Sequence, residues 1–348
     1  MVQTISQIEN FNEEVEGSKK KEKSGCAGLG VGYTLISTAA FSLASTLLKK
    51  SAAKWHPFTV GVVTFPVATI FFIPFVIYGM ITNPKSLKVG LIPWKENKTS
   101  LFFVGVRTFL SSVIPFVLVW SLQYISVGDM RTILAASVIS VHFVGWAWLG
   151  EKCGVVPTLA AILALVGIGV LTRPPILIGK EAFDQNTLVG VSIAVLAMAM
   201  VTLIIVVVRW LQYVHQGVLN LSLYAWATLQ SLVLALIFNT LEEFNTKGTT
   251  WEDIGAMVAI GVLWAIGNLC LVLALQIEEA GIVGLIRTSE VVFTFGWQWI
   301  LLGVPPDWIS MLGALLVVSG VVAVIARKLV QALPKTNEVR KSFNFLLK

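Results

Sequence analysis

Charge is scarce in this chain, and so is cysteine. Of its 348 residues only 13% are charged and three are cysteines, whereas 56% are apolar. A soluble domain of this length does not need so large an apolar fraction for its core. Cys26, Cys153 and Cys270 are too far apart for a disulfide framework or a metal site. The composition therefore predicts an integral membrane protein without a structural metal.

Several functional motifs are also absent. The sequence has no Gly-rich loop ending in Lys-Ser/Thr that would cradle nucleotide phosphates, so ATP does not drive this protein and no cofactor is expected. Nucleophilic catalysis needs a base beside the nucleophile. The cysteine nearest to His142 in sequence is Cys153, at a predicted membrane edge, and we expect no enzyme. The net charge of +6 lies at the flanks of the apolar runs, which reflects topology and not nucleic acid binding.

Ten apolar runs have the length of membrane-spanning helices, which need about 20 residues to cross about 30 Å of hydrocarbon. We therefore predict an all-α membrane protein with ten transmembrane helices. The runs lie near residues 28–48, 57–80, 101–124, 130–148, 155–172, 187–209, 219–240, 253–277, 281–302 and 308–326.

Basic residues indicate how the chain is oriented. With an internal N-terminus, the cytoplasmic segments hold 16 of the 25 Lys and Arg residues and the opposite side holds 7, while Arg107 and Arg287 lie inside spans. Cytoplasmic loops retain the excess of Lys and Arg, so both termini are predicted to be cytoplasmic. The predicted segments are a disordered tail (1–27), a first five-helix repeat (28–172), a linker (173–186), a second repeat (187–326) and a C-terminal tail (327–348).

The two halves match each other at a spacing of 153 residues. This spacing pairs Trp146 with Trp299 and Gly150 with Gly303, besides several apolar residues. Because each half has an odd number of spans, the second copy must enter the membrane upside down relative to the first. Such inverted repeats are typical of secondary transporters.

Short motifs carry a resemblance to a known family. The segment 124–129 (Tyr-Ile-Ser-Val-Gly-Asp), the turn 149–152 (Leu-Gly-Glu-Lys) and the exit 167–175 resemble the EamA module of the drug/metabolite transporter superfamily. The Arg-Pro-Pro run and Gly179 are most similar to the G subgroup of the solute carrier 35 family. The resemblance implies a bundle of ten helices around a central cavity, and its G subgroup implies organic anion transport. At 137–143 the sequence departs from the family's Ser-Pro-Val-Phe and has no proline.

Four ionisable residues lie deep in the predicted spans, where a charge costs about 2.5 to 3.5 kcal/mol on insertion scales. They are Arg107, His142, Arg287 and Glu290, and the helical rise places all four between the midplane and the cytoplasmic side. Arg107 has no acid on its own helix and is our first candidate for binding a carboxylate or phosphate. Arg287 and Glu290 share a helix face, and a structural ion pair is as compatible with the sequence as substrate contact.

Other polar residues extend this candidate site. Ser111 lies one turn beyond Arg107, and Trp264 and Asn268 form a stripe on the predicted eighth span. The substrate-binding candidates are thus Arg107, Arg287, Trp264, Asn268 and Ser111. Glu290 and His142 are candidates for proton coupling, although a histidine bonded within a bundle is the commoner case.

We interpret the chain as a secondary-active or facilitative carrier of a small organic anion, which works by alternating access between two inverted halves. A nucleotide-sugar or other metabolite carrier of the same fold stays open, as does a membrane scaffold acting through its tails. The partners expected are a small-molecule substrate and the lipid bilayer. Small residues such as Gly167 and Gly320 suit helix packing and equally suit a homodimer. We favour the plasma membrane over an internal membrane.

Overall fold

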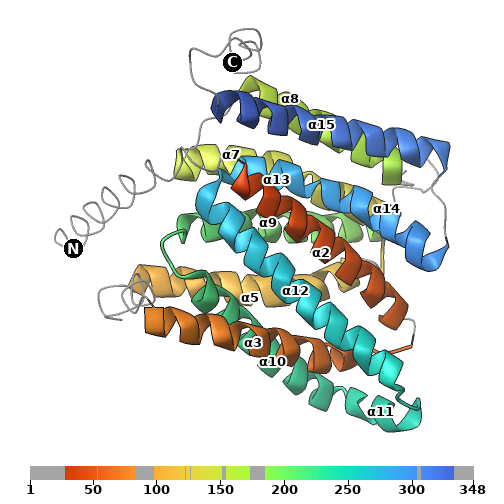
Figure 1. The fold of residues 1–348 in the computed structure, drawn as a ribbon. Helices are drawn as coiled ribbons and strands as arrows, with labels where there is room; N and C mark the ends of the chain where they lie inside the picture. The colour runs from red at the N-terminus through yellow and green to blue at the C-terminus, as the bar shows by residue number, and fades with distance from the viewer. Residues whose placement is uncertain are drawn as a thin grey trace.

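The computed structural model describes residues 28–52, 54–82, 98–121, 123–125, 127–150, 154–172, 185–303 and 307–332. All regular structure within these ranges is helical, and the helices form one layered bundle (Figure 1). The predicted tail 1–27 and the greater part of the linker 173–186 lie outside the described residues, as do Cys26 and Cys153.

The described residues form a succession of helices along the chain. Their bounds are α2 Leu29–Ala52, α3 Pro57–Thr82, α5 Lys98–Ser121, α6 Val127–Ala135, α7 Ser137–Leu149, α8 Val155–Thr172, α9 Gln185–Trp210, α10 Gln216–Ile237, η1 Thr240–Glu242, α11 Glu243–Thr246, α12 Trp251–Ile277, α13 Ala280–Arg287, α14 Ser289–Leu302 and α15 Trp308–Ala332. Nine stretches of this described part are long and apolar enough to cross a membrane. The run predicted at 281–302 is divided into α13 and α14, and α15 continues past residue 326 into the predicted tail.

Two of the predicted spans are interrupted in mid-course. The first break separates α6 from α7 at Ala136, and the second separates α13 from α14 at Thr288. At the second break the hydroxyl groups of Thr288 and Ser289 each donate to a backbone carbonyl of the preceding turn, at 2.7 Å. Side-chain hydroxyls that bond the local backbone bend helices and help to satisfy broken helices within membranes.

Both interrupted spans also end in the same way. Gly150 closes α7 and Gly303 closes α14, each with φ +66°. A left-handed residue at the end of a helix strongly favours glycine, which has no Cβ to clash. These are the two glycines that the 153-residue spacing pairs.

Polar contacts identify the two ends of the bundle. At one end the turn between α2 and α3 is held to the start of α12, where Lys54 Nζ lies 2.6 Å from Asp253 Oδ2. At the opposite end of α12, Gln276 Nε2 donates to Val214 O at 2.9 Å in the loop between α9 and α10. We call these the α2–α3 end and the α9–α10 end. The predicted topology assigns the α9–α10 end to the cytoplasm.

Helix packing crosses the boundary between the two halves of the sequence. α2 packs against α12, and α3 packs against both α10 and α12. α5 packs against α9, and α8 packs against α15. The α8–α15 pair lies along one edge of the bundle (Figure 1). Its backbones approach so closely that a Cβ on Gly167 would lie 2.8 Å from Gly313 O, and one on Gly320 would lie 2.8 Å from Ala160 O. Gly167 and Gly320 therefore serve packing within one chain.

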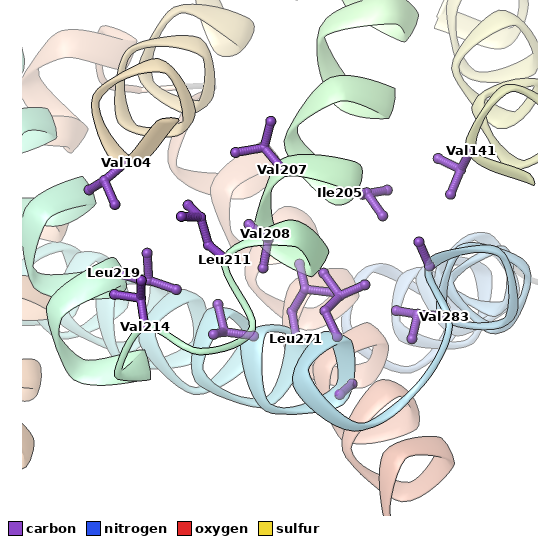
Figure 2. Packing of buried hydrophobic residues seen from close by; sticks show 14 residues of the cluster. Val104, Val141, Ile205, Val207, Val208, Leu211, Val214, Leu219, Leu271 and Val283 are labelled. Carbon is purple, nitrogen blue, oxygen red and sulfur yellow. The ribbon is translucent and has the colours of Figure 1, made fainter. Parts of the chain in front are cut away.

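An apolar cluster fills the α9–α10 end of the bundle, around the loop that joins α9 to α10 (Figure 2). Val141, Leu211, Leu219 and Leu275 have no exposed surface, which shows that this cluster is packed. We call this cluster the inner plug. Its fourteen buried members are Val104, Val141, Ile205, Val207, Val208, Leu211, Val214, Leu219, Leu271, Val272, Ala274, Leu275, Ala280 and Val283.

Candidate functional site

The break between α13 and α14 places a positive and a negative side chain together. Arg287 is the last residue of α13, and its Nη2 lies 3.4 Å from Glu290 Oε2 on α14. The Arg287 side chain is 24% exposed and the Glu290 side chain is 19% exposed. A charge-assisted N–H···O bond is usually about 2.7 to 2.9 Å long. The pair is therefore loosely held and partly accessible.

An aromatic ring from α2 lies beneath the guanidinium group. The centroid of the Phe41 ring is 5.7 Å from Arg287 Cζ, within the range of a cation–π contact. The same ring packs on Gly267 of α12, where an added Cβ would come within 3.0 Å of it. Ser37, one turn earlier on α2, donates to Gly267 O at 2.8 Å. Phe41 thus joins the α13–α14 break to α12.

Polar side chains of α2 and α14 continue this wall. Trp297 Nε1 donates to Ser42 Oγ at 3.1 Å, and Ser289 Oγ lies 3.4 Å from Thr38 Oγ1. The hydroxyl group of Thr294 donates to Glu290 O at 2.8 Å. Ser289 and Trp297 of α14 therefore contact polar side chains of α2, whereas the Thr294 bond lies within α14.

Trp264 and Asn268 are brought together by α10. Asn268 Nδ2 donates to the hydroxyl oxygen of Tyr224 at 2.5 Å, and that hydroxyl donates to Trp264 O at 2.9 Å. The Trp264 ring stacks on Phe65 of α3, with centroids 5.6 Å apart. Both predicted residues are partly buried, so α12 presents an indole and an amide that are already oriented.

Arg107 occupies a different environment from Arg287. Its side chain is 2% exposed, Nη1 donates to Leu219 O, and Nη2 donates to Asn220 Oδ1 at 3.0 Å. Within the described residues its Nε has no hydrogen-bond partner and no carboxylate pairs with it. Arg107 thus joins α5 to the first turns of α10, at the edge of the inner plug to which Leu219 belongs. Ser111 lies one turn farther along α5 and is half-buried.

His142 lies between α7 and α13. Its Nδ1 is 2.9 Å from Val138 O, and its ring packs on Gly281, where an added Cβ would lie 2.7 Å from the ring carbon Cδ2. Gly281 precedes Arg287 by six residues, about one and two-thirds helical turns, so the two residues lie on different faces of α13. The structure therefore separates His142 from the Arg287–Glu290 pair.

Sequence reasoning missed three aromatic residues of this region: Phe41, Tyr224 and Trp297. The chain has 19 Phe and 12 Trp residues, so an aromatic side chain in an apolar run carries no signal of its own. Of the three, only Phe41 could have been suspected from its position, because it lies between the small polar residues Thr38 and Ser42 on the predicted first span.

Comparisons with known proteins agree with this architecture. A model of the EamA-like transporter family matches residues 28–173 and 188–326. Solute carrier family 35 member G1 of Homo sapiens is 27% identical over 321 residues, which cover 90% of this chain and 83% of that protein. The pseudopaline exporter of Pseudomonas aeruginosa is 23% identical over 299 residues, covering 86% of this chain and 96% of the exporter.

A solved structure shares the fold. This structure, described as "Crystal structure of protein", matches with a TM-score of 0.65 and a sequence identity of 18%, and the match covers 86% of this chain and 99% of that one. The helical architecture, the family match and the relatives identify a multi-pass membrane transporter of small molecules that resembles the G subgroup of solute carrier family 35. The chain therefore belongs to the EamA-like transporter family.

Proposed function

We propose that this protein carries a small organic anion and binds its carboxylate or phosphate at Arg287. The observation that carries the proposal is the state of this side chain: it is partly exposed, and its carboxylate partner lies 3.4 Å away. A guanidinium group offers five N–H donors in a planar fork that suits two oxygens of an anion. Arg287 can therefore accept a ligand without rearrangement of the helices.

The surroundings of Arg287 suit the rest of such a molecule. Phe41 contributes aromatic surface beside the guanidinium group, and Trp297 contacts Ser42, the next residue of α2. Trp264 and Asn268 lie on α12, the helix on which the Phe41 ring packs. Ligand sites in proteins commonly combine apolar and aromatic walls with a few placed polar groups. We expect an anion whose body is compact and partly apolar.

Arg107, our first candidate from sequence, receives a different role in this proposal. Its Nη1 and Nη2 already donate to Leu219 O and Asn220 Oδ1, and its side chain is buried beside the inner plug. We assign it to holding α10 against α5 while the α9–α10 end is closed. When that end opens, these bonds break and the guanidinium group becomes available to the substrate.

Transport requires that the two ends of the site open in turn, and the packing suggests which helices move together. α2 packs on α12, α3 packs on both α10 and α12, and α14 packs on α2. In contrast, α5, α6 and α7 pack on α9. We propose that these two groups rock against each other, and not the two halves of the sequence. The inverted repeat remains the basis of the proposal, because the 153-residue spacing matches α2 with α9 and α5 with α12, and the helices of each such pair would then exchange environments.

The test is uptake of labelled organic anions into proteoliposomes by wild type, Arg287→Ala and Arg287→Lys. We expect saturable uptake by wild type, loss of at least tenfold in the alanine variant and partial retention with lysine, which keeps the charge but not the planar fork. Lys50→Ala is the matched control, because Lys50 is an exposed cation on the last turn of α2.

Three outcomes would contradict the proposal. Unchanged uptake by Arg287→Ala would show that the anion binds elsewhere. If folded wild-type protein transports no small carboxylate or phosphate but exchanges the much larger nucleotide sugars or another metabolite, the substrate class is wrong. A phenotype that depends only on residues 1–27 would instead support a scaffold acting through its tail.

A further inference from the structure

Charge balance at the α13–α14 break constrains how an anion can bind there. In the absence of substrate the positive charge of Arg287 is matched by Glu290 at 3.4 Å. An anion that takes the place of the Glu290 carboxylate leaves two negative charges beside one positive charge. An unmatched charge in a low-dielectric interior is strongly disfavoured, and a carboxylate in that position takes up a proton.

The charged groups around Glu290 are few in the described part of the chain. α14 packs against α2, α13 and α15. α13 contributes Arg287, whereas the basic residues of α2, Lys49 and Lys50, are on its last turn. On α15, Lys328 pairs with Glu278 at 2.6 Å, and Arg327 lies against Gly154 of the α9–α10 end. Within the described residues, Arg287 is thus the charged side chain that faces Glu290.

We propose that Glu290 takes up one proton when a singly charged anion binds Arg287, so that anion and proton cross the membrane together. This inference rests on the proposed anion function of the same site. In the transfer, a proton from the aqueous medium forms an O–H bond on the Glu290 carboxylate, and the anion replaces that carboxylate beside Arg287. The site is neutral before and after binding, and the loaded carrier moves no net charge.

The experiment uses proteoliposomes with wild type and Glu290→Gln, and measures the accumulation of one labelled monocarboxylate under two driving forces. One is a gradient of one pH unit without membrane potential, and the other is a membrane potential of about 59 mV at equal pH. A gradient of one pH unit can concentrate a solute that moves with one proton by at most about tenfold. A potential of about 59 mV sets the same limit for a solute that moves one net charge. For wild type we expect accumulation approaching this limit with the pH gradient and none with the potential.

Glu290→Gln should reverse this dependence. Glutamine takes up no proton, so the bound anion crosses with Arg287 alone and its accumulation follows the potential. Glu252→Gln is the matched control, because it makes the same chemical change at an exposed residue in the first turn of α12, and it should behave as wild type. If Glu290 served folding alone, the variant would show lower uptake under both driving forces. Its uptake would not change from following the pH gradient to following the potential.

Wild-type behaviour decides the proposal even if the variant does not fold. Accumulation that follows the potential and ignores pH would overturn proton coupling, as would uptake that ignores both forces, which indicates a zwitterionic or otherwise neutral substrate. Exchange of labelled for unlabelled anion at equal pH and zero potential tests the anion site separately. If exchange persists while coupling is absent, only this inference fails; if no anion exchanges, the proposed function fails.

Discussion

Arg107 offers a direct test of how the α9–α10 end is held closed. We predict that Arg107→Met favours the state in which this end is open, because methionine fills similar space and cannot donate to Leu219 O or Asn220 Oδ1. A hydrogen bond to a charged group contributes about 1.5 to 3 kcal/mol. Leu219 O also accepts from the Ser222 hydroxyl at 3.0 Å, so we count only the bond to Asn220. The loss then corresponds to a shift of about tenfold to a hundredfold in the population of the open state.

The assay follows the exposure of the inner plug. Leu211, which has no exposed surface, is replaced by cysteine in a background where Cys26, Cys153 and Cys270 are serine. The rate of modification by a membrane-impermeant maleimide is then measured with and without Arg107→Met. We expect modification to be at least tenfold faster in the methionine variant, because the thiol reacts only when the plug opens.

A matched control separates this effect from a general loosening of α5. Ser112→Ala removes a hydroxyl group that donates to Phe109 O within α5, the one bond it makes among the described residues. It should leave the rate of thiol modification unchanged. Equal rates in wild type and Arg107→Met, with both proteins monodisperse, would refute the assignment of Arg107 to closure.

Three further predictions concern packing and the start of α10. Gly281→Ala should weaken the α7–α13 contact by about 1 to 3 kcal/mol through overpacking against the His142 ring, which thermal unfolding in detergent measures, and His142→Ala should restore stability. Gly313→Leu should separate α8 from α15 and lower the unfolding temperature markedly, since even a Cβ there would lie 2.6 Å from a backbone nitrogen. Burial lowers the pKa of His215, whose neutral Nδ1 accepts from Gly217 N at the start of α10. Its stabilising effect should therefore be present above the ordinary histidine pKa and lost as the pH falls through the lowered pKa, whereas an Asn substitute, which retains a capping oxygen, should show no such loss.

The sequence was sufficient to predict the positions of the long helices. Membrane crossing requires runs of about 20 apolar residues, and few other constraints compete with that requirement. The ion pair of Arg287 and Glu290 was also accessible from sequence, because residues three apart share a helix face. The interruptions at Ala136 and Thr288 were not predicted, since neither position has a proline.

The contacts between helices were beyond the sequence. The partner of Arg107 is Asn220 of α10, and the partner of Asn268 is Tyr224 of the same helix. These pairs depend on which spans are neighbours, and the apolar periodicity of a membrane helix does not encode its neighbour. For the same reason Phe41, which contacts both Arg287 and Gly267, could not be distinguished from other aromatic residues of the spans.

The two interrupted spans share their geometry but differ in chemistry. Gly150 and Gly303 end α7 and α14 with the same left-handed conformation, at matched positions of the 153-residue spacing. At the same spacing, however, Leu134 stands opposite Arg287 and Ser137 stands opposite Glu290. An inverted scaffold that bound an anion equally in both halves would need a cation near both breaks. Because the position that matches Arg287 is a leucine, we expect one anion per chain, bound off the axis that relates the halves. Equilibrium binding of a labelled anion to purified protein should therefore saturate at one equivalent.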